Sequence, residues 1–229
     1  MTPDHPSATV TPSPNCGERR GGVLPDMIVL HFTGMESCAA AHERLCDPGA
    51  EVSAHYLISE TGELWQLVPE ALRAWHAGAG HWAGTDDVNS RSIGIELVNT
   101  GTAPFPEPQM AALEGLMRGI MGRWSIEPHR VIAHSDMAPD RKFDPGPRFD
   151  WRRLALLGLS VWPCPGAEGN FLESARRFGY PPEAAPEEIL HAFRLRFRPW
   201  ASGPADATDA GLAADLARRF PVDRAGPNA

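Results

Sequence analysis

The chain has 229 residues, 42% of them hydrophobic, and a formal net charge of −8 at pH 7. This length suits one sizeable domain, either alone or with a small second domain. The negative charge argues against a nucleic-acid partner bound through its phosphates and against docking on an anionic membrane surface. No apolar run approaches the roughly 20 residues that span a bilayer, so the sequence predicts no transmembrane segment.

The N-terminal residues are rich in proline, serine and threonine and lack the apolar stretch of a secretory signal. We therefore expect residues 1–10 to be disordered and the protein to be cytoplasmic. A periplasmic location is the alternative, if a signal or lipoprotein peptide has been removed from the chain. We also expect a monomer.

The four cysteines form neither a CxxC pair nor a zinc-finger spacing. Cys38 and Cys46 are eight residues apart and lie in or just past an expected helix over 36–45, which would separate them by about 12 Å. That separation exceeds the reach of a disulfide. We therefore expect reduced thiols at all four positions, which are Cys16, Cys38, Cys46 and Cys164.

Apolar runs and turn residues predict the elements of the first half of the chain. In order, these are a buried strand over 27–30 that ends at His31, a helix over 36–45, and a hairpin with strands at 52–59 and 64–68. A loop over 73–84 follows. It is rich in glycine and tryptophan and carries two histidines, so it could present flat aromatic surface to a ligand.

The next expected strand, over 92–98, contains one charged residue, Glu96, among apolar neighbours. Carboxylates are rarely buried without a partner. Glu96 therefore indicates either a functional group or a buried salt bridge, for which Lys142 and Arg91 are candidate partners.

The second half of the chain is mostly helical in pattern. We expect an amphipathic helix over 108–124, a strand over 131–134 that ends at His134, and a short helix over 151–157. The proline-rich segment 162–166 predicts a domain boundary. Beyond it, three helical patterns predict a small bundle, with helices at about 171–178, 186–196 and 209–220.

His134 opens the loop around which the chain is organised. Its prolines at 139, 145 and 147 restrict the backbone, so we expect an ordered loop. Lys142 and Asp144 lie within it. Such a loop could bring an imidazole, a carboxylate and an ammonium group to one point, although a proline-rich surface loop with ordinary charges is the simpler alternative.

Two predicted strands end in histidine, and the ordered loop adds a carboxylate. Catalytic zinc sites use three protein ligands and leave a fourth position open, with histidine and carboxylate as common ligands. His31, His134 and Asp144 are therefore candidate ligands. Glu96 could act as a general base, and Lys142 could stabilise an oxyanion. Together these groups suit the hydrolysis of an amide.

Several segments resemble, in the same order, the type-2 family of zinc-dependent N-acetylmuramoyl-L-alanine amidases. This family is related to phage lysozyme-type amidases and to peptidoglycan recognition proteins. The resemblance covers roughly residues 11–160. The matching segments are Val29–His31, Val52–Ile58, Arg73–Gly78, Asn89, Ser92–Leu97 and His134–Trp151.

The resemblance implies an α/β fold, with a central mixed β-sheet flanked by helices, over residues 11–162. It implies that His31, His134 and Asp144 hold Zn²⁺, that Glu96 is the catalytic acid and base, and that Lys142 stabilises the transition state. It also implies cleavage of the amide between N-acetylmuramic acid, possibly in its 1,6-anhydro form, and L-alanine of the peptidoglycan stem peptide, in cell-wall turnover or recycling. The alternative is a non-catalytic module that recognises muropeptides, but such modules typically lack part of the ligand set.

Five further residues are candidates for lining the substrate groove: His55, Trp75, His76, Asn89 and Arg141. Trp75 and His76 could equally support their loop. Arg141 could bind a peptide carboxylate or simply cap the loop.

Residues 167–223 resemble, more weakly, a three-helix peptidoglycan-binding domain. Phe171–Tyr180 matches the opening of that domain, whereas Ile189–Arg194 departs from its usual Phe-Gln pair. We therefore expect a bundle that either binds the cell wall or packs against the catalytic domain and shapes its groove.

Overall fold

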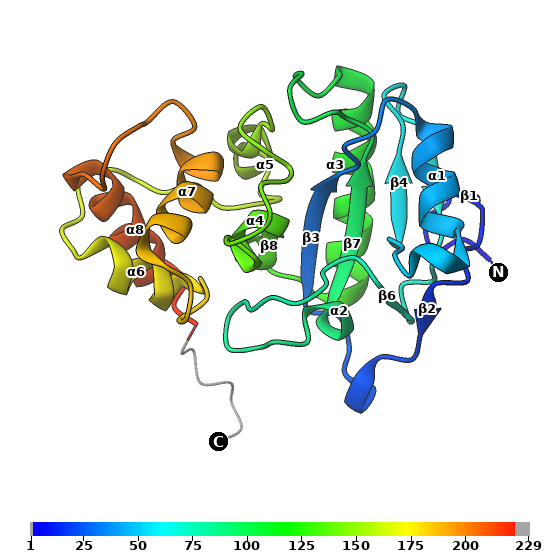
Figure 1. The fold of residues 1–229 in the computed structure, drawn as a ribbon, viewed down its shortest axis with the longest axis horizontal. Coiled ribbons are helices and arrows are strands. Elements are labelled where there is room, and N and C mark those ends of the chain that lie inside the picture. The colour runs from blue at the N-terminus through cyan, green and yellow to red at the C-terminus, as the bar shows by residue number, and fades with distance from the viewer. Residues whose placement is uncertain (1, 223–229) are drawn as a thin grey trace.

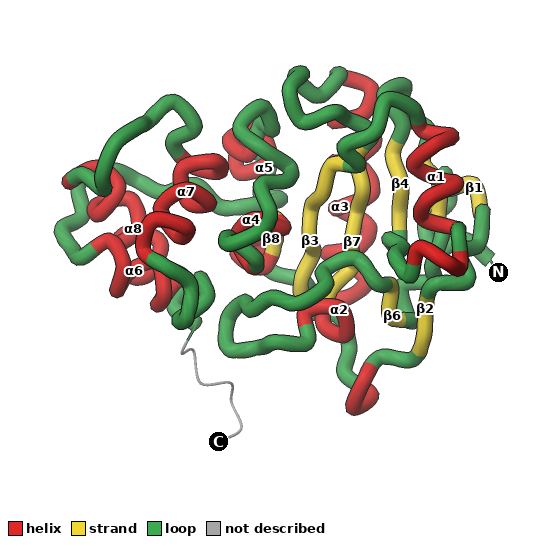
Figure 2. Tube along the Cα trace, in the orientation of Figure 1, coloured by secondary structure: helices red, strands yellow, loops and turns green. Residues whose placement is uncertain are grey.

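A six-stranded mixed sheet forms the centre of the computed structural model, which describes residues 2–222 (Figure 1). The strand order is β1-β5-β4-β7-β3-β8. Strand β7 lies parallel to both β3 and β4, and β3 lies parallel to β8, whereas β4 and β5 are antiparallel. Helices flank this sheet (Figure 2). The predicted central mixed sheet with flanking helices is therefore confirmed.

The secondary structure follows the apolar patterns of the sequence. The strands of the large sheet are β1 (Thr9–Val10), β3 (Met27–Phe32), β4 (Tyr56–Ile58), β5 (Leu64–Gln66), β7 (Ser92–Leu97) and β8 (Val131–Ala133). A separate small sheet pairs β2 (Cys16–Gly17) with β6 (Arg73–Ala74). The α-helices are α1 (Cys38–Cys46), α2 (Val88–Arg91), α3 (Glu107–Trp124), α4 (His134–Met137), α5 (Trp151–Leu156), α6 (Phe171–Phe178), α7 (Pro186–Phe197) and α8 (Ala207–Arg219). Residues 2–222 also contain three short 3-10 helices: Arg20–Gly22, Pro48–Ala50 and Pro128–Arg130.

The two faces of the sheet bury different residues because side chains alternate along each strand. Ile28 and Leu30 of β3 and Ile93 and Ile95 of β7 pack in one cluster with the apolar stripe of α3. In Figure 1 this helix lies behind β3 and β7. The opposite side chains of the same strands, which include His31, therefore face away from α3.

The N-terminal segment is part of the fold. Thr9 and Val10 pair in parallel with β5, and the backbone N–H of Asp4 donates to Gln66 Oε1 at 2.8 Å. The Asp4 carboxylate in turn accepts from the backbone N–H of Glu70 at 2.9 Å. The prediction that residues 1–10 are disordered is therefore wrong for residues 2–10, because the edge of the sheet supplies them with hydrogen-bond partners. Met1 lies outside the described residues.

The three C-terminal helices form at the predicted places but do not have a core of their own. Phe178, Phe193 and Phe197 belong to one hydrophobic cluster with Met27 and Val29 of β3. The bundle stands at one end of the molecule, next to α4 and β8 (Figure 1). Apolar side chains from before and after the predicted boundary at 162–166 thus pack together in one cluster. Residue 223, the predicted end of this region, lies outside the described residues.

Two further expectations concern cysteines and membranes. All four cysteines are free, as predicted. Among residues 2–222, no helix combines the length and the apolar character needed to cross a bilayer.

Candidate active site

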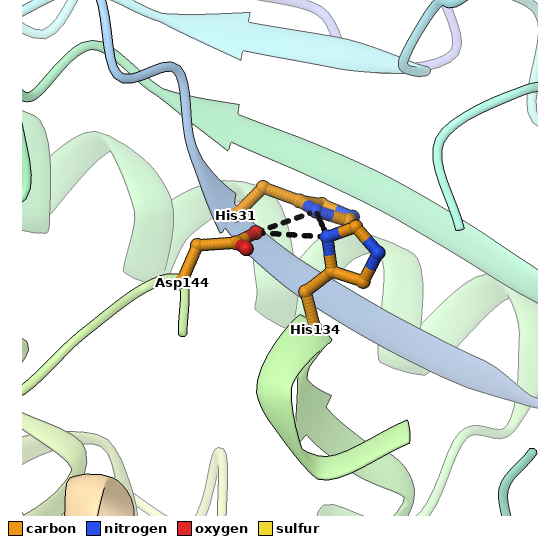
Figure 3. A group of neighbouring side chains, drawn as sticks. All are labelled: His31, His134 and Asp144. Carbon is orange, nitrogen blue, oxygen red and sulfur yellow. Dashed lines mark hydrogen bonds and ion pairs between the residues drawn. The ribbon is translucent and has the colours of Figure 1, made fainter. Parts of the chain in front are cut away.

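His31, His134 and Asp144 meet at one point, although more than 100 residues separate the first from the second (Figure 3). The two Nδ1 atoms are 2.9 Å apart, and each lies 3.0 Å from Asp144 Oδ2. All three residues are buried. Zinc at about 2.0 Å from each of three tetrahedral ligands would hold those ligand atoms roughly 3.3 Å apart. The spacing and chemistry of these donors therefore fit a metal site.

The fold brings the three groups together through strand register and a closed loop. His31 is the fifth residue of β3, and His134 begins α4 directly after β8, which lies beside β3. The backbone N–H of Ser135 donates to the carbonyl of Asp144 at 3.1 Å, which closes the loop between them. The backbone N–H of Lys142 donates to the carbonyl of Ala138 at 3.0 Å. The loop is therefore ordered, as its prolines predicted.

The protonation states suit metal binding. Burial and the nearby His134 lower the pKa of His31 to about 4, so this imidazole is neutral at pH 7. Burial alone would raise the pKa of Asp144, but its close contacts with His134 and His31 outweigh burial and hold that pKa well below its usual value. A neutral imidazole and an ionised carboxylate are the forms that bind metals.

Glu96 lies beside this group because β3 and β7 are parallel and pair His31 with Glu96 in register. Burial, and then the negative charge of Asp144, raise its pKa to about 8, while Lys142 opposes the shift. Its Oε2 atom is buried and has no hydrogen-bond partner in the described chain. The alternative of a salt bridge to Arg91 is wrong, since the Arg91 guanidinium pairs with Asp26.

A pocket of about 320 Å³ opens over the three converging groups. That volume lies within the usual range for small-molecule sites. Trp75, His76 and Arg141 line the pocket, together with Glu96 and Lys142. These three predicted substrate-binding residues are thus brought to the same place as the candidate catalytic groups.

His55 and Asn89 do not line this pocket, which corrects their placement in the groove. Both are buried and bind the main chain. His55 Nδ1 accepts from the backbone N–H of Gly94 at 3.0 Å, and its Nε2 lies 3.1 Å from the carbonyl of Leu72. Asn89 Oδ1 accepts from the backbone N–H groups of His76 and Ala77, at 3.0 and 2.9 Å. Both side chains therefore hold neighbouring segments in place.

The hydrogen bonds of Arg141 suit the second of the two roles predicted for it. Its guanidinium donates to the carbonyl of Ala77 at 2.9 Å and to that of Ala79. It therefore ties its own loop to residues 77–79 and also forms part of the pocket wall.

Sequence reasoning missed several residues of the pocket wall, among them Arg44 of α1 and Phe143. Phe143 is 55% exposed, and its ring packs against Phe32 with centroids 5.3 Å apart. The sequence signal for Phe143 was an aromatic residue directly after Lys142 in the predicted ordered loop. Arg44 is one exposed arginine on a helix, and nothing in the local pattern distinguishes it from other surface charges.

Comparisons with known proteins agree on one family. The sequence profile of the N-acetylmuramoyl-L-alanine amidase family matches residues 21–147. The chain is 36% identical over 234 residues to the N-acetylmuramoyl-L-alanine amidase AmiD of Escherichia coli, a match that covers 86% of this chain and 84% of the relative. It is 44% identical over 167 residues to the 1,6-anhydro-N-acetylmuramyl-L-alanine amidase AmpD of Salmonella typhimurium, covering 65% of this chain and 89% of the relative.

A solved structure extends the agreement to the fold. The complex of E. coli AmiD with the substrate anhydro-N-acetylmuramic acid-L-Ala-D-gamma-Glu-L-Lys superposes with a TM-score of 0.78 at 33% identity. The match covers 90% of this chain and 98% of that structure. The chain therefore belongs to the N-acetylmuramoyl-L-alanine amidase family, and it is an enzyme that cleaves the amide between N-acetylmuramic acid and L-alanine.

Proposed function

We propose that this amidase acts on 1,6-anhydro-muropeptides in the recycling of peptidoglycan. Two relatives support this substrate: AmpD carries the anhydro sugar in its name, and AmiD was solved with an anhydro-muramyl tripeptide. The observation that carries the proposal is the complete constellation of His31, His134 and Asp144, with Glu96 beside it in one pocket. A module that only recognises muropeptides would have no need for all four groups.

The metal proposed for the site is zinc, held by His31 Nδ1, His134 Nδ1 and Asp144 Oδ2. Two imidazoles and one carboxylate are a common ligand set of catalytic zinc, and three protein ligands leave a position open. Zinc supplies Lewis acidity, which polarises the scissile carbonyl and makes a water molecule a better nucleophile at neutral pH.

Glu96 is the proposed acid and base. As a carboxylate it accepts a proton from the attacking water while the new C–O bond forms at the carbonyl carbon. It then delivers this proton to the nitrogen of L-alanine as the C–N bond breaks, which yields a carboxylic acid and a free amine. Its raised pKa of about 8 suits both directions of transfer near neutral pH. A cation held by His31, His134 and Asp144 would favour the ionised form of Glu96 that starts the cycle.

Lys142 is proposed to stabilise the oxyanion of the tetrahedral intermediate. Its side chain lines the pocket, and its charge acts on both Glu96 and His31. An ammonium group aimed at developing negative charge in a partly desolvated site lowers the barrier.

Trp75 and Arg141 are proposed to contact the muropeptide from the pocket wall. In addition to its bond to Ala77, the Arg141 guanidinium could pair with a carboxylate of the stem peptide.

The C-terminal bundle is proposed to pack against the catalytic domain and shape it, in preference to binding the cell wall. A buried ion pair supports this role, in which Arg196 of α7 donates to Asp136 Oδ2 at 2.6 Å. The Tyr180 hydroxyl donates to the other oxygen of Asp136 at 2.6 Å. Asp136 lies on α4, the short helix that begins at His134. The bundle thus holds the element that carries one metal ligand.

The compartment and the assembly are proposed as cytoplasmic and monomeric. Four free thiols suit a reducing compartment. Every group of the candidate site comes from one chain, so a second copy is not needed to complete it. Cell fractionation and light scattering on the purified protein test these two points.

One assay tests the proposed substrate. The purified protein is incubated with an anhydro-muropeptide and, separately, with intact sacculi, with and without a chelator, and the released peptides are identified by mass. We expect the free stem peptide from the anhydro-muropeptide, at a higher rate than from sacculi, and no release with the chelator. Equal or faster release from sacculi would contradict the recycling substrate. Stoichiometric muropeptide binding without any product would support the recognition module.

A further inference from the structure

A chain of hydrogen bonds leads away from His31 on the side opposite the metal ligands. His31 Nδ1 faces His134 and Asp144, whereas its Nε2 lies 3.0 Å from Nδ1 of His76. The other ring nitrogen of His76, Nε2, lies 3.1 Å from the hydroxyl oxygen of Ser92. That hydroxyl lies 2.6 Å from the carbonyl oxygen of Val88. All three side chains of this chain are buried.

The direction of each hydrogen bond in this chain follows from the last group, the carbonyl oxygen of Val88. A carbonyl oxygen can only accept, so the Ser92 hydroxyl donates its hydrogen to Val88. The Ser92 oxygen then has lone pairs left for His76, and His76 Nε2 must carry the hydrogen that it donates. In a neutral imidazole only one nitrogen carries hydrogen. His76 Nδ1 is therefore an acceptor, and His31 Nε2–H donates to it.

This order leaves His31 Nδ1 without a hydrogen, and its lone pair points at His134 and Asp144. We propose that His76 and Ser92 are positioning residues, which hold His31 in the Nε2–H tautomer and orient its ring so that Nδ1 is the ligand atom. The proposal rests on the metal site of the proposed function and deepens it. It also gives a defined role to His76, for which sequence reasoning left open a place in the substrate groove and a support of its loop.

The hydrogen-bonded chain from His31 through His76 and Ser92 to the carbonyl of Val88 is called the relay. The sheet provides the space for it. Ser92, Gly94 and Glu96 alternate along β7 and face the same side. The His76 ring lies over the middle one, since a Cβ atom at position 94 would come within 2.4 Å of His76 Cγ. Glycine at this position therefore lets the imidazole reach both Ser92 and His31.

The same segment also fixes the second histidine ligand. His134 Nε2 lies 3.0 Å from the carbonyl oxygen of Ala77, so it donates there and leaves Nδ1 free for the metal. Asn89 Oδ1 accepts from the backbone N–H groups of His76 and Ala77. The short segment of His76 and Ala77, anchored by Asn89, thus sets the tautomers of both metal-binding imidazoles. The His76 side chain acts on His31, and the Ala77 carbonyl acts on His134.

The relay is tested by zinc affinity, measured by competition with a chromophoric chelator on the full chain. Partners that orient a ligating histidine typically change metal affinity 10- to 100-fold. His76→Leu removes the acceptor, and we expect zinc to bind roughly 10- to 100-fold more weakly. His76→Asn places an amide oxygen near the position of Nδ1, so it should restore most of that loss. Equal zinc affinity of the wild type and His76→Leu would overturn the proposal.

Two further measurements keep the test decisive if His76→Leu does not fold. Ser92→Ala removes one neutral hydrogen bond, and we expect zinc to bind about fivefold more weakly. His81→Leu is the matched control, since His81 pairs with Asp86 outside the relay and should leave the zinc affinity unchanged. Wild-type affinity in Ser92→Ala, or an equal loss in the control, would contradict the relay.

The tautomers themselves can be observed by nitrogen-15 NMR of the metal-free protein at pH 7.5. We expect His31 and His76 both to carry hydrogen on Nε2 only. An Nδ1–H tautomer at either residue would refute the relay. None of these readouts needs a substrate, so a failure of the relay would leave the amidase assay unaffected. Conversely, an inactive wild-type protein with the expected tautomers would overturn only the proposed function.

Discussion

Replacing Arg196 with methionine tests whether the C-terminal bundle is an integral part of the amidase. The side chains of Arg196 and Asp136 are both 0% exposed, and they form a direct ion pair. The same guanidinium also donates to the carbonyl of Val131 at 2.9 Å and lies over the ring of Trp151. The change therefore leaves a buried carboxylate without its counter-charge and removes one donor from the carbonyl of Val131.

The expected size of the effect follows from what Asp136 retains. Removing one partner of a buried pair destabilises a protein by about 3–5 kcal/mol. Asp136 still accepts from the Tyr180 hydroxyl and from the backbone N–H of Ala133, at 2.6 and 2.9 Å. Because Asp136 keeps these two donors, we expect a loss of folding free energy near the lower end of that range, at about 3 kcal/mol. For a chain of this size, that loss lowers the melting temperature by about 6–12 °C.

Urea unfolding followed by circular dichroism measures this loss. Arg153→Met is the matched control, because Arg153 pairs with Glu107 and Glu114 nearer the surface, where such pairs contribute about 0–1 kcal/mol. Arg196→Met should unfold in one transition at lower urea, since the bundle and the sheet share a hydrophobic cluster. A loss no larger than that of the control, or a separate early transition of the bundle alone, would refute this reasoning.

Three other predictions concern the site. Glu96→Gln should keep zinc but lower kcat by about 10²- to 10⁴-fold, and wild-type turnover would show that Glu96 is not the base. Arg141→Ala should raise KM with kcat largely kept, and steady-state kinetics on a muropeptide would reveal the opposite pattern if Arg141 acts in the chemical step. Burial lowers the pKa of His31 to about 4 and of His55 to about 3, against 6.5 when unfolded. As the pH falls, the unfolded chain therefore takes up protons at a higher pH than the folded chain does. The metal-free protein should have its full stability above pH 6.5 and lose about 2–3 kcal/mol per imidazole by pH 4.5. Urea titrations at several pH values measure this loss, and a stability that does not change with pH would contradict the prediction.

The convergence of the candidate ligands could be predicted because each one follows a strong local signal. His31 and His134 end apolar runs, and neighbouring parallel strands deliver such ends to the same edge of a sheet. The prolines around Asp144 made an ordered loop predictable. Glu96 stood out as the one charge in an apolar strand, and its place beside His31 follows from a register that no local pattern encodes.

Other parts of the site depend on contacts that the sequence does not display. Ser92 is an ordinary strand serine until the fold places it under His76. His55 and Asn89 look like groove residues because polar side chains near a motif suggest ligands, yet both are used to hold the main chain. Helix α7 carries two arginines, Arg194 and Arg196, and both are buried. Only the packing of the bundle shows that Arg196 pairs with Asp136, whereas Arg194 pairs with Asp209.

The metal centre can be tested most directly by diffraction from crystals grown with zinc, with data collected at the zinc absorption edge. We predict one strong anomalous peak per chain, about 2.0–2.2 Å from Nδ1 of His31, Nδ1 of His134 and an oxygen of Asp144. A peak at any other place, or a metal bound through the Nε2 atoms of these histidines, would contradict the account.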